Sequence, residues 1–124
     1  MDDNRPKHLD LSKIKLPLPA FVSILHRASG ALLFLALPLL LLMLQYSLRS
    51  IETYTQLAGV LHHPLSKLFL LGLLWAFLHH FCAGIRFLLI DIDYGVRLAQ
   101  ARASSKWVIS VSLALTVLGG VRLW

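Results

Sequence analysis

Residues 21–48 read FVSILHRASGALLFLALPLLLLMLQYSL, and the second half of this run contains no charged residue. A helix needs about 20 residues to cross the hydrocarbon core of a bilayer, so the run is long enough to span a membrane. Its first turns nevertheless carry Ser23, His26 and Arg27. Ionisable side chains inside a membrane helix are costly and are usually retained for a function. The sequence therefore predicts a membrane helix that holds a ligand near one end.

Two further apolar runs occur at residues 65–90 and 106–124, and 57% of the 124 residues are hydrophobic. Soluble domains are about half apolar, so the composition favours a membrane protein. We expect an all-α membrane protein with three transmembrane helices, at about 21–48, 65–90 and 106–124. The whole chain, residues 1–124, then forms a single membrane-anchor domain. Residues 1–20 are predicted to form a cytoplasmic interfacial segment that lies on the membrane surface or against a soluble partner, with a disordered tail as the alternative.

The connections between the apolar runs are expected to be loops, at residues 49–64 and 91–105. One interfacial turn is compatible with the spacing of apolar residues in the first loop. Pro64 suits the start of the second span. Pro38 lies inside the first span and is expected to bend or loosen the helix, because it removes one backbone donor.

Lysine and arginine are distributed unevenly between the two predicted sides. The N-terminal side and the second loop hold Arg5, Lys7, Lys13, Lys15, Arg27, Arg86, Arg97, Arg102 and Lys106, and the opposite side holds Arg49, Lys67 and Arg122. The positive-inside rule then predicts a cytoplasmic N-terminus and a periplasmic C-terminus. Orientation also accounts for the net charge of +6. No nucleic-acid partner is expected, because no basic stripe with interleaved aromatic residues occurs.

Four residues at the start of the first span share one helical stripe, at positions i, i+3, i+4 and i+7: Ser23, His26, Arg27 and Gly30. Arginine suits carboxylate or carbonyl oxygens, and serine or histidine donates to the same groups. The glycine allows a partner to approach closely. The alternative is that Arg27 extends to the lipid headgroups, with His26 beside it.

A second set of residues shares one face near the end of the second span: His80, Gly84, Phe87 and Asp91. A histidine in an apolar span needs a partner, and a metal is the strongest partner for a neutral imidazole. Gly84 leaves room for a flat macrocycle, which makes His80 a candidate haem ligand. A hydrogen bond to a neighbouring helix remains the alternative. His79 competes for the same role, but the spacing to Gly84 favours His80.

The two sets of residues are expected to lie at the same depth. The first two spans run antiparallel, so the end of the second is level with the start of the first. A haem held by His80 would then direct its carboxylates towards His26 and Arg27, and the two sets would form one site.

Several motifs resemble those of one known family: Arg5-Pro6, Leu9-Asp10-Leu11, Ser23-Ile24-Leu25-His26-Arg27 with Ser29-Gly30, and His80-x-x-x-Gly84-Ile85-Arg86 with Asp91. The chain resembles, over its whole length, the cytochrome b membrane anchor (C) subunit of bacterial succinate dehydrogenase, the respiratory complex II. The resemblance implies a four-subunit complex in the bacterial inner membrane that serves the respiratory chain and the tricarboxylic acid cycle. In it, a flavoprotein subunit oxidises succinate and an iron–sulfur subunit relays the electrons. This chain would be half of a heterodimeric anchor bundle that binds haem b and ubiquinone with a second small membrane anchor subunit.

The resemblance also implies roles for individual residues. His80 would be one axial ligand of the haem iron, with the second ligand supplied by the other anchor. Ser23 and Arg27 would belong to the quinone site, and His26 and Arg27 would contact the haem propionates. Asp91 would assist proton delivery to the quinone. The chain would contribute to quinone reduction without a catalytic residue of its own for succinate.

One position departs from the family pattern, because Phe87 stands where many members carry a second histidine after the motif arginine. Any polar contact made by that histidine must be absent or replaced. Alternative functions are the anchor of a fumarate reductase, a cofactor-free structural membrane anchor and a small transporter subunit. The last is disfavoured because the ionisable groups gather near one face and do not form a path across the membrane.

Overall fold

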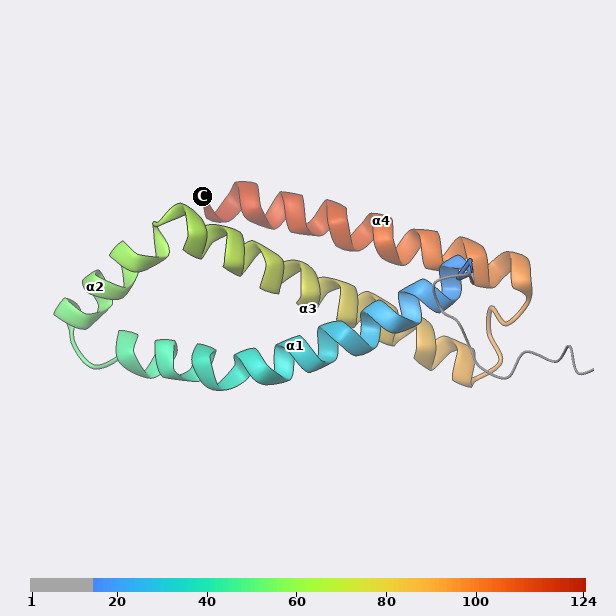
Figure 1. Ribbon diagram of the computed structural model, residues 1–124, viewed down its shortest axis with the longest axis horizontal. Helices are drawn as coiled ribbons and strands as arrows, with labels where there is room; N and C mark the ends of the chain where they lie inside the picture. The colour runs from blue at the N-terminus through green and yellow to red at the C-terminus, as the bar shows by residue number, and fades with distance from the viewer. Residues whose placement is uncertain (1–14) are drawn as a thin grey trace, which may run out of the picture.

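The computed structural model describes residues 15–124, which fold into four helices (Figure 1). In chain order they are α1 (Leu18–Ser47), α2 (Ile51–Leu61), α3 (Pro64–Asp91) and α4 (Leu98–Leu123). The part of the chain that is described contains no strand.

Three of the helices, α1, α3 and α4, are long and apolar enough to cross a membrane. This confirms the prediction of an all-α chain with three candidate membrane-spanning helices. Much of the apolar surface points outwards; the side chains of Phe34 and Leu35, for example, are 75% and 73% exposed. Lipid tails or neighbouring membrane helices can cover such a surface at no cost, whereas water cannot. The predicted interfacial segment at residues 1–20 lies mostly outside the described residues.

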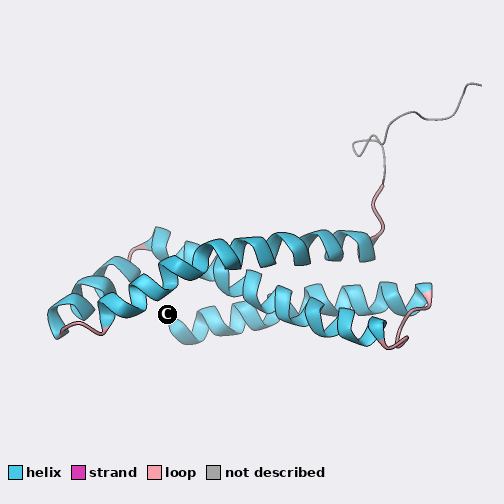
Figure 2. Ribbon diagram, turned by 90° about the horizontal axis from the view of Figure 1, so that it is seen from below, coloured by secondary structure: helices cyan, strands magenta, loops and turns pink. Residues whose placement is uncertain are grey.

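The three long helices form one bundle in which α3 contacts both α1 and α4, and α1 also contacts α4 (Figure 2). The N-terminal end of α1 and the connection between α3 and α4 lie at one end of the bundle, and α2 and the C-terminus lie at the other. A small buried cluster of Val22, Ala83 and Val108 joins the three helices. Small side chains of this kind allow membrane helices to approach closely.

Helix α1 continues through Pro38 to Ser47. Figure 1 shows it changing direction between its blue and green halves, in agreement with the bend expected from the proline. The helix begins at Leu18, between Pro17 and Pro19, and so starts slightly before the apolar run that predicted it.

The prediction of a loop at residues 49–64 is wrong, because α2 occupies most of it. Ser50 and Thr53 cap this helix reciprocally: the Thr53 amide donates to Ser50 Oγ at 3.2 Å, and the Ser50 amide donates to Thr53 Oγ1 at 3.1 Å. A serine or threonine pair three residues apart satisfies two backbone donors that the first turn leaves free. The Tyr46 hydroxyl also donates to Gln56 Oε1 at 2.6 Å and ties α2 to α1.

The second connection is also shorter than predicted, because α4 begins at Leu98 and not at Lys106. The apolar run marks where a helix enters lipid, and the helical backbone extends beyond it through polar turns. Only residues 92–97 connect α3 to α4. Asp93 and Gly95 take positive φ angles of 61° and 80° there, which allows a tight reversal.

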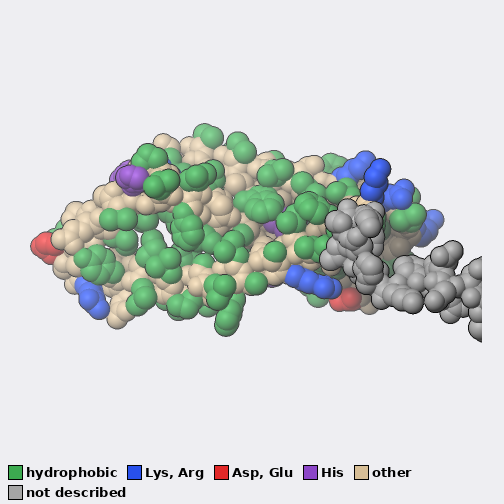
Figure 3. All heavy atoms as spheres, in the orientation of Figure 1, with side chains coloured by type: hydrophobic (Ala, Val, Ile, Leu, Met, Phe, Trp, Pro, Cys, Tyr) green, Lys and Arg blue, Asp and Glu red, His purple; other side chains and the backbone are tan. Residues whose placement is uncertain are grey.

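The basic side chains collect at the end of the bundle where α1 begins, as the space-filling view shows (Figure 3). At that end lie Lys15, Arg27, Arg86, Arg97, Arg102 and Lys106, whereas Arg49, Lys67 and Arg122 lie towards the other. Among residues 15–124, the basic residues at the start of α1 and those around the connection between α3 and α4 thus lie at one end of the bundle.

Candidate functional site

The imidazole rings of His26 on α1 and His80 on α3 are stacked, with centroids 4.2 Å apart and planes 9° from parallel. The sequence predicted that the end of the second span is level with the start of the first, with His80 a few residues deeper than His26; the structure brings the two rings into direct contact. Antiparallel packing of α1 and α3 produces this pairing near the basic end of the bundle.

One nitrogen of the His80 ring is held by the backbone of α1. His80 Nδ1 lies 3.0 Å from the carbonyl oxygen of His26 and 3.3 Å from Ser29 Oγ. The Ser29 hydroxyl donates to the same carbonyl at 2.9 Å. A carbonyl can only accept, so Nδ1 is the donor in this contact, and in the neutral ring the lone pair is then on Nε2. This arrangement is the one that holds metal-binding histidines in a fixed orientation.

Gly30 makes room for the His80 ring. A Cβ atom at position 30 would stand 2.8 Å from Cε1 and 3.2 Å from Nδ1 of His80. Only glycine therefore allows the ring to reach the α1 backbone. The close approach predicted at this glycine occurs, and the group that approaches is His80.

Gly84 lies beside the ring of His26, since a Cβ atom there would be 3.7 Å from His26 Nε2. That is ordinary van der Waals distance. Phe87 packs against the same ring with its centroid 5.1 Å away and its plane tilted by 53°. In place of the polar contact of a second histidine, position 87 thus provides an apolar contact to His26.

His79 faces the interior of the bundle. Its side chain is fully buried, and neither ring nitrogen has a hydrogen-bond partner among the residues that the structure describes. The Trp75 ring lies next to it, with centroids 5.3 Å apart. His79 is therefore enclosed by this chain, whereas His80 is only partly buried, and the choice of His80 as the haem ligand stays a prediction.

Ser23, Arg27 and Asp91 lie at the same end of the bundle as the stacked rings. Ser23 is half-buried, whereas Arg27 and Asp91, the last residue of α3, are exposed. Within residues 15–124, none of the three makes a side-chain hydrogen bond or ion pair.

The donor set fits one axial position of a haem. His80 offers a single oriented nitrogen, and the first turns of α1 supply a cation and a hydroxyl nearby. No group of three or more His, Cys, Asp or Glu side chains able to hold a bare metal ion occurs within residues 15–124. A metal bound here would therefore need further ligands from a porphyrin and from another chain.

Two polar contacts in the structure were not predicted from the sequence. Ser29 was noted only as part of a motif, yet it donates to the carbonyl that holds His80. Its position three residues after His26 was the available signal, because a helical serine can donate to the carbonyl at i−3. The other contact joins Arg86 of α3 to Ser104 of α4 at 2.9 Å. No sequence spacing predicts it, since it depends on how the two helices pack.

Comparison with known proteins gives consistent matches over nearly the whole chain. The sequence model of the succinate dehydrogenase/fumarate reductase transmembrane subunit family matches residues 1–119. The chain is 38% identical over 125 aligned residues to the succinate dehydrogenase cytochrome b556 subunit of Coxiella burnetii, with both chains covered completely. It is 34% identical to the cytochrome b556 subunit of Paracoccus denitrificans, over 93% of this chain and 88% of that protein. The mitochondrial cytochrome b560 subunit of Dictyostelium discoideum is 28% identical, over 92% of this chain and 60% of that protein.

Proposed function

The chain belongs to the family of succinate dehydrogenase/fumarate reductase transmembrane subunits, as a cytochrome b556-type, haem-binding membrane anchor of succinate dehydrogenase, and on that premise we propose how it holds its cofactors. His80 ligates the iron of haem b, and the polar groups at the start of α1 bind ubiquinone. Electrons reach this site from the iron–sulfur subunit.

The observation that carries the haem assignment is the hydrogen bond from His80 Nδ1 to the His26 carbonyl at 3.0 Å. It holds the ring in one orientation with Nδ1 as the donor, which leaves Nε2 as the nitrogen available to a metal. Haem b, when bound, supplies a one-electron carrier whose potential depends on its axial ligands and its burial. A second protein ligand would have to come from the second small membrane anchor subunit, as the family resemblance implies; His79 is enclosed and His26 is stacked on the His80 ring.

His26 and Arg27 would hold the haem propionates. The guanidinium of Arg27 is exposed at the end of the bundle where the two histidines meet. Arginine and carboxylate form short, charge-assisted hydrogen bonds, so the pair fixes the orientation of the macrocycle. The exposure of Arg27 is also compatible with the alternative in which its side chain only reaches lipid headgroups. The Arg27→Lys variant distinguishes the two.

Ubiquinone is bound beside Ser23 and Arg27. Its reduction to ubiquinol takes two electrons from the iron–sulfur subunit and two protons from water. The Ser23 hydroxyl and the Arg27 guanidinium donate hydrogen bonds to the ring carbonyls, where negative charge develops on reduction. Asp91, exposed at the end of α3, delivers protons from the aqueous side.

The chain is a subunit of the succinate dehydrogenase complex, and we assign it three neighbours: the second small anchor, the iron–sulfur subunit and the flavoprotein. The exposed apolar surface of α1, including Phe34 and Leu35, provides area for the second anchor and for lipid. The basic end of the bundle faces the cytoplasm and the C-terminus faces the periplasm of a bacterial inner membrane, as the positive-inside rule favours.

The decisive experiment is the optical spectrum of the purified, dithionite-reduced complex. His80→Ala should abolish the b-type haem band, whereas His79→Ala should keep it, because His79 points into the bundle. Retention of the band in His80→Ala would contradict the ligand assignment. A complex that assembles without any haem in the wild type would leave the cofactor-free structural anchor as the remaining function.

A further inference from the structure

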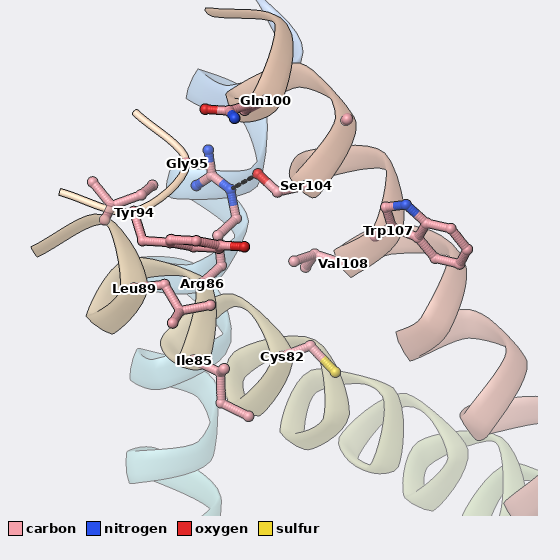
Figure 4. Close-up of a pocket in the computed structure, with 12 residues that line it drawn as sticks. Cys82, Ile85, Arg86, Leu89, Tyr94, Gly95, Gln100, Ser104, Trp107 and Val108 are labelled. Atoms are coloured by element: carbon pink, nitrogen blue, oxygen red, sulfur yellow. Dashed lines mark hydrogen bonds between the residues drawn. The ribbon is translucent and has the colours of Figure 1, made fainter. Parts of the chain in front are cut away.

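A second candidate site lies on the other side of α3, away from the stacked histidines. A pocket of about 420 Å³ opens between the end of α3, the 92–97 connection and the start of α4 (Figure 4). Most of its wall is apolar and is formed by Cys82, Ile85, Leu89, Ile90, Trp107 and Val108. Arg86 supplies a cation to the same pocket. Arg86 comes six positions after His80, which places the two residues roughly 120° apart around the helix.

Arg86 is buried without an anionic partner in the part of the chain that is described. Its side chain is only 6% exposed. Nε donates to Ser104 Oγ at 2.9 Å, and Nη2 donates to the Ala101 carbonyl at 3.4 Å. Both acceptors are neutral, and Nη1 makes no hydrogen bond within residues 15–124. A desolvated cation inside a membrane protein is costly unless an anion compensates it, so the pocket favours an anionic occupant.

The position of the pocket indicates what kind of anion it takes. Arg86 lies five residues before the end of α3, at the basic end of the bundle. Tyr94 and Trp107 line the pocket and are each 70% exposed. Aromatic side chains of this kind concentrate at the level of lipid headgroups. An apolar wall joined to a buried cation at this depth matches an amphiphile with a negative head.

We propose that this pocket binds one anionic glycerophospholipid, with its phosphate on Arg86 and an acyl chain along Cys82 and Trp107. Figure 4 shows the Arg86 guanidinium between Gly95, Gln100 and Ser104, so the side-chain amide of Gln100 adds a polar contact for the headgroup. The bound lipid fills the gap between α3 and α4 and supplies the charge that Arg86 lacks. This site is separate from the haem and quinone proposals and does not depend on them.

The test measures lipid retained by the complete purified complex. The complex is reconstituted in nanodiscs of phosphatidylcholine with phosphatidylglycerol, extracted into mild detergent, washed and analysed by native mass spectrometry. The wild type should keep one phosphatidylglycerol per copy of this chain. Arg86→Gln should lower that retention by about fivefold or more, the effect expected for one basic residue near a membrane surface. Arg102→Gln is the matched control, because it removes the same charge from an exposed position at the same end.

A second variant keeps Arg86 and removes the space. Ala103 lines the pocket and is exposed, so Ala103→Phe should fill the pocket without disturbing the helix interface. Ala103→Phe should lower phosphatidylglycerol retention as Arg86→Gln does. If the complex with Arg86→Gln fails to assemble, Ala103→Phe provides the test. Retention equal to the wild type in Ala103→Phe would overturn the proposal, as would equal retention of phosphatidylcholine and phosphatidylglycerol in the wild type. Displacement of the lipid by glycerol phosphate alone would overturn the role of the acyl chain.

Discussion

The His80 ring packs against the α1 backbone at Gly30, which has no side chain. A Cβ atom at this position would lie 2.8 Å from His80 Cε1. That separation is below the distance at which carbon atoms pack. The backbone of α1 and the ring of α3 are thus matched in shape. The hydrogen bond from Nδ1 to the His26 carbonyl depends on this match.

Gly30→Ala should therefore displace the His80 ring and lower the haem content of the purified complex. Loss of the orienting hydrogen bond should weaken haem retention by about tenfold or more, which is the usual effect of disturbing a contact behind a metal ligand. The measurement is the reduced spectrum relative to protein. Gly72→Ala is the control, since a Cβ atom there meets nothing within 4 Å. Full haem content in Gly30→Ala would show that the ring has room to move without losing iron.

Ser29→Ala should leave the haem bound and lower its midpoint potential. The Ser29 hydroxyl competes for the His26 carbonyl, so its removal strengthens the bond from His80 Nδ1 and makes the ring a better donor to ferric iron. A decrease of about 20 to 60 mV corresponds to at most a tenfold change for a one-electron couple. Redox titration of the haem band measures it. Ser112→Ala, which removes a serine bonded within α4, should leave the potential unchanged. An equal shift in both variants would argue against a local effect.

Arg27→Leu should lower succinate–quinone turnover by about tenfold or more, because it removes a donor to the developing charge on the quinone. Succinate oxidation with an artificial electron acceptor should survive, since it bypasses the membrane site. Arg102→Leu removes an exposed arginine at the same end of the bundle and should affect neither activity. Equal loss of both activities in Arg27→Leu would indicate failed assembly. Full quinone turnover in Arg27→Lys would favour the alternative in which the side chain only reaches lipid headgroups.

The three long helices were predictable from the sequence because membrane burial imposes long apolar runs. The helix ends were not. The cap at Ser50 and Thr53 starts a helix in a segment that lacks a long apolar run, and α4 begins at Leu98 among polar residues. In both places backbone hydrogen bonds determine the helix, and hydropathy carries little information about them.

Antiparallel packing of the first two spans predicted that His26 and His80 lie near the same end of the bundle. It did not predict that their rings stack. Side-chain contacts between helices depend on rotation about each helix axis, which a repeat of 3.6 residues leaves loosely defined. For the same reason the enclosure of His79 and the bond from Arg86 to Ser104 appear only in the folded chain. Roles that depend on haem, quinone and the second anchor stay predictions from the family resemblance.

The orientation of the bundle gives a prediction that does not depend on the cofactors. A reporter fused after Trp124 should read as periplasmic, and the same reporter inserted at Gly95 should read as cytoplasmic, because the connection at residues 92–97 lies at the basic end. Alkaline phosphatase activity reports periplasmic fusions, and green fluorescence reports cytoplasmic ones. The two fusions lie at opposite ends of α4, so each serves as the control for the other. The reverse pattern would place the proposed quinone site on the periplasmic side. It would also contradict delivery of electrons from a cytoplasmic iron–sulfur subunit.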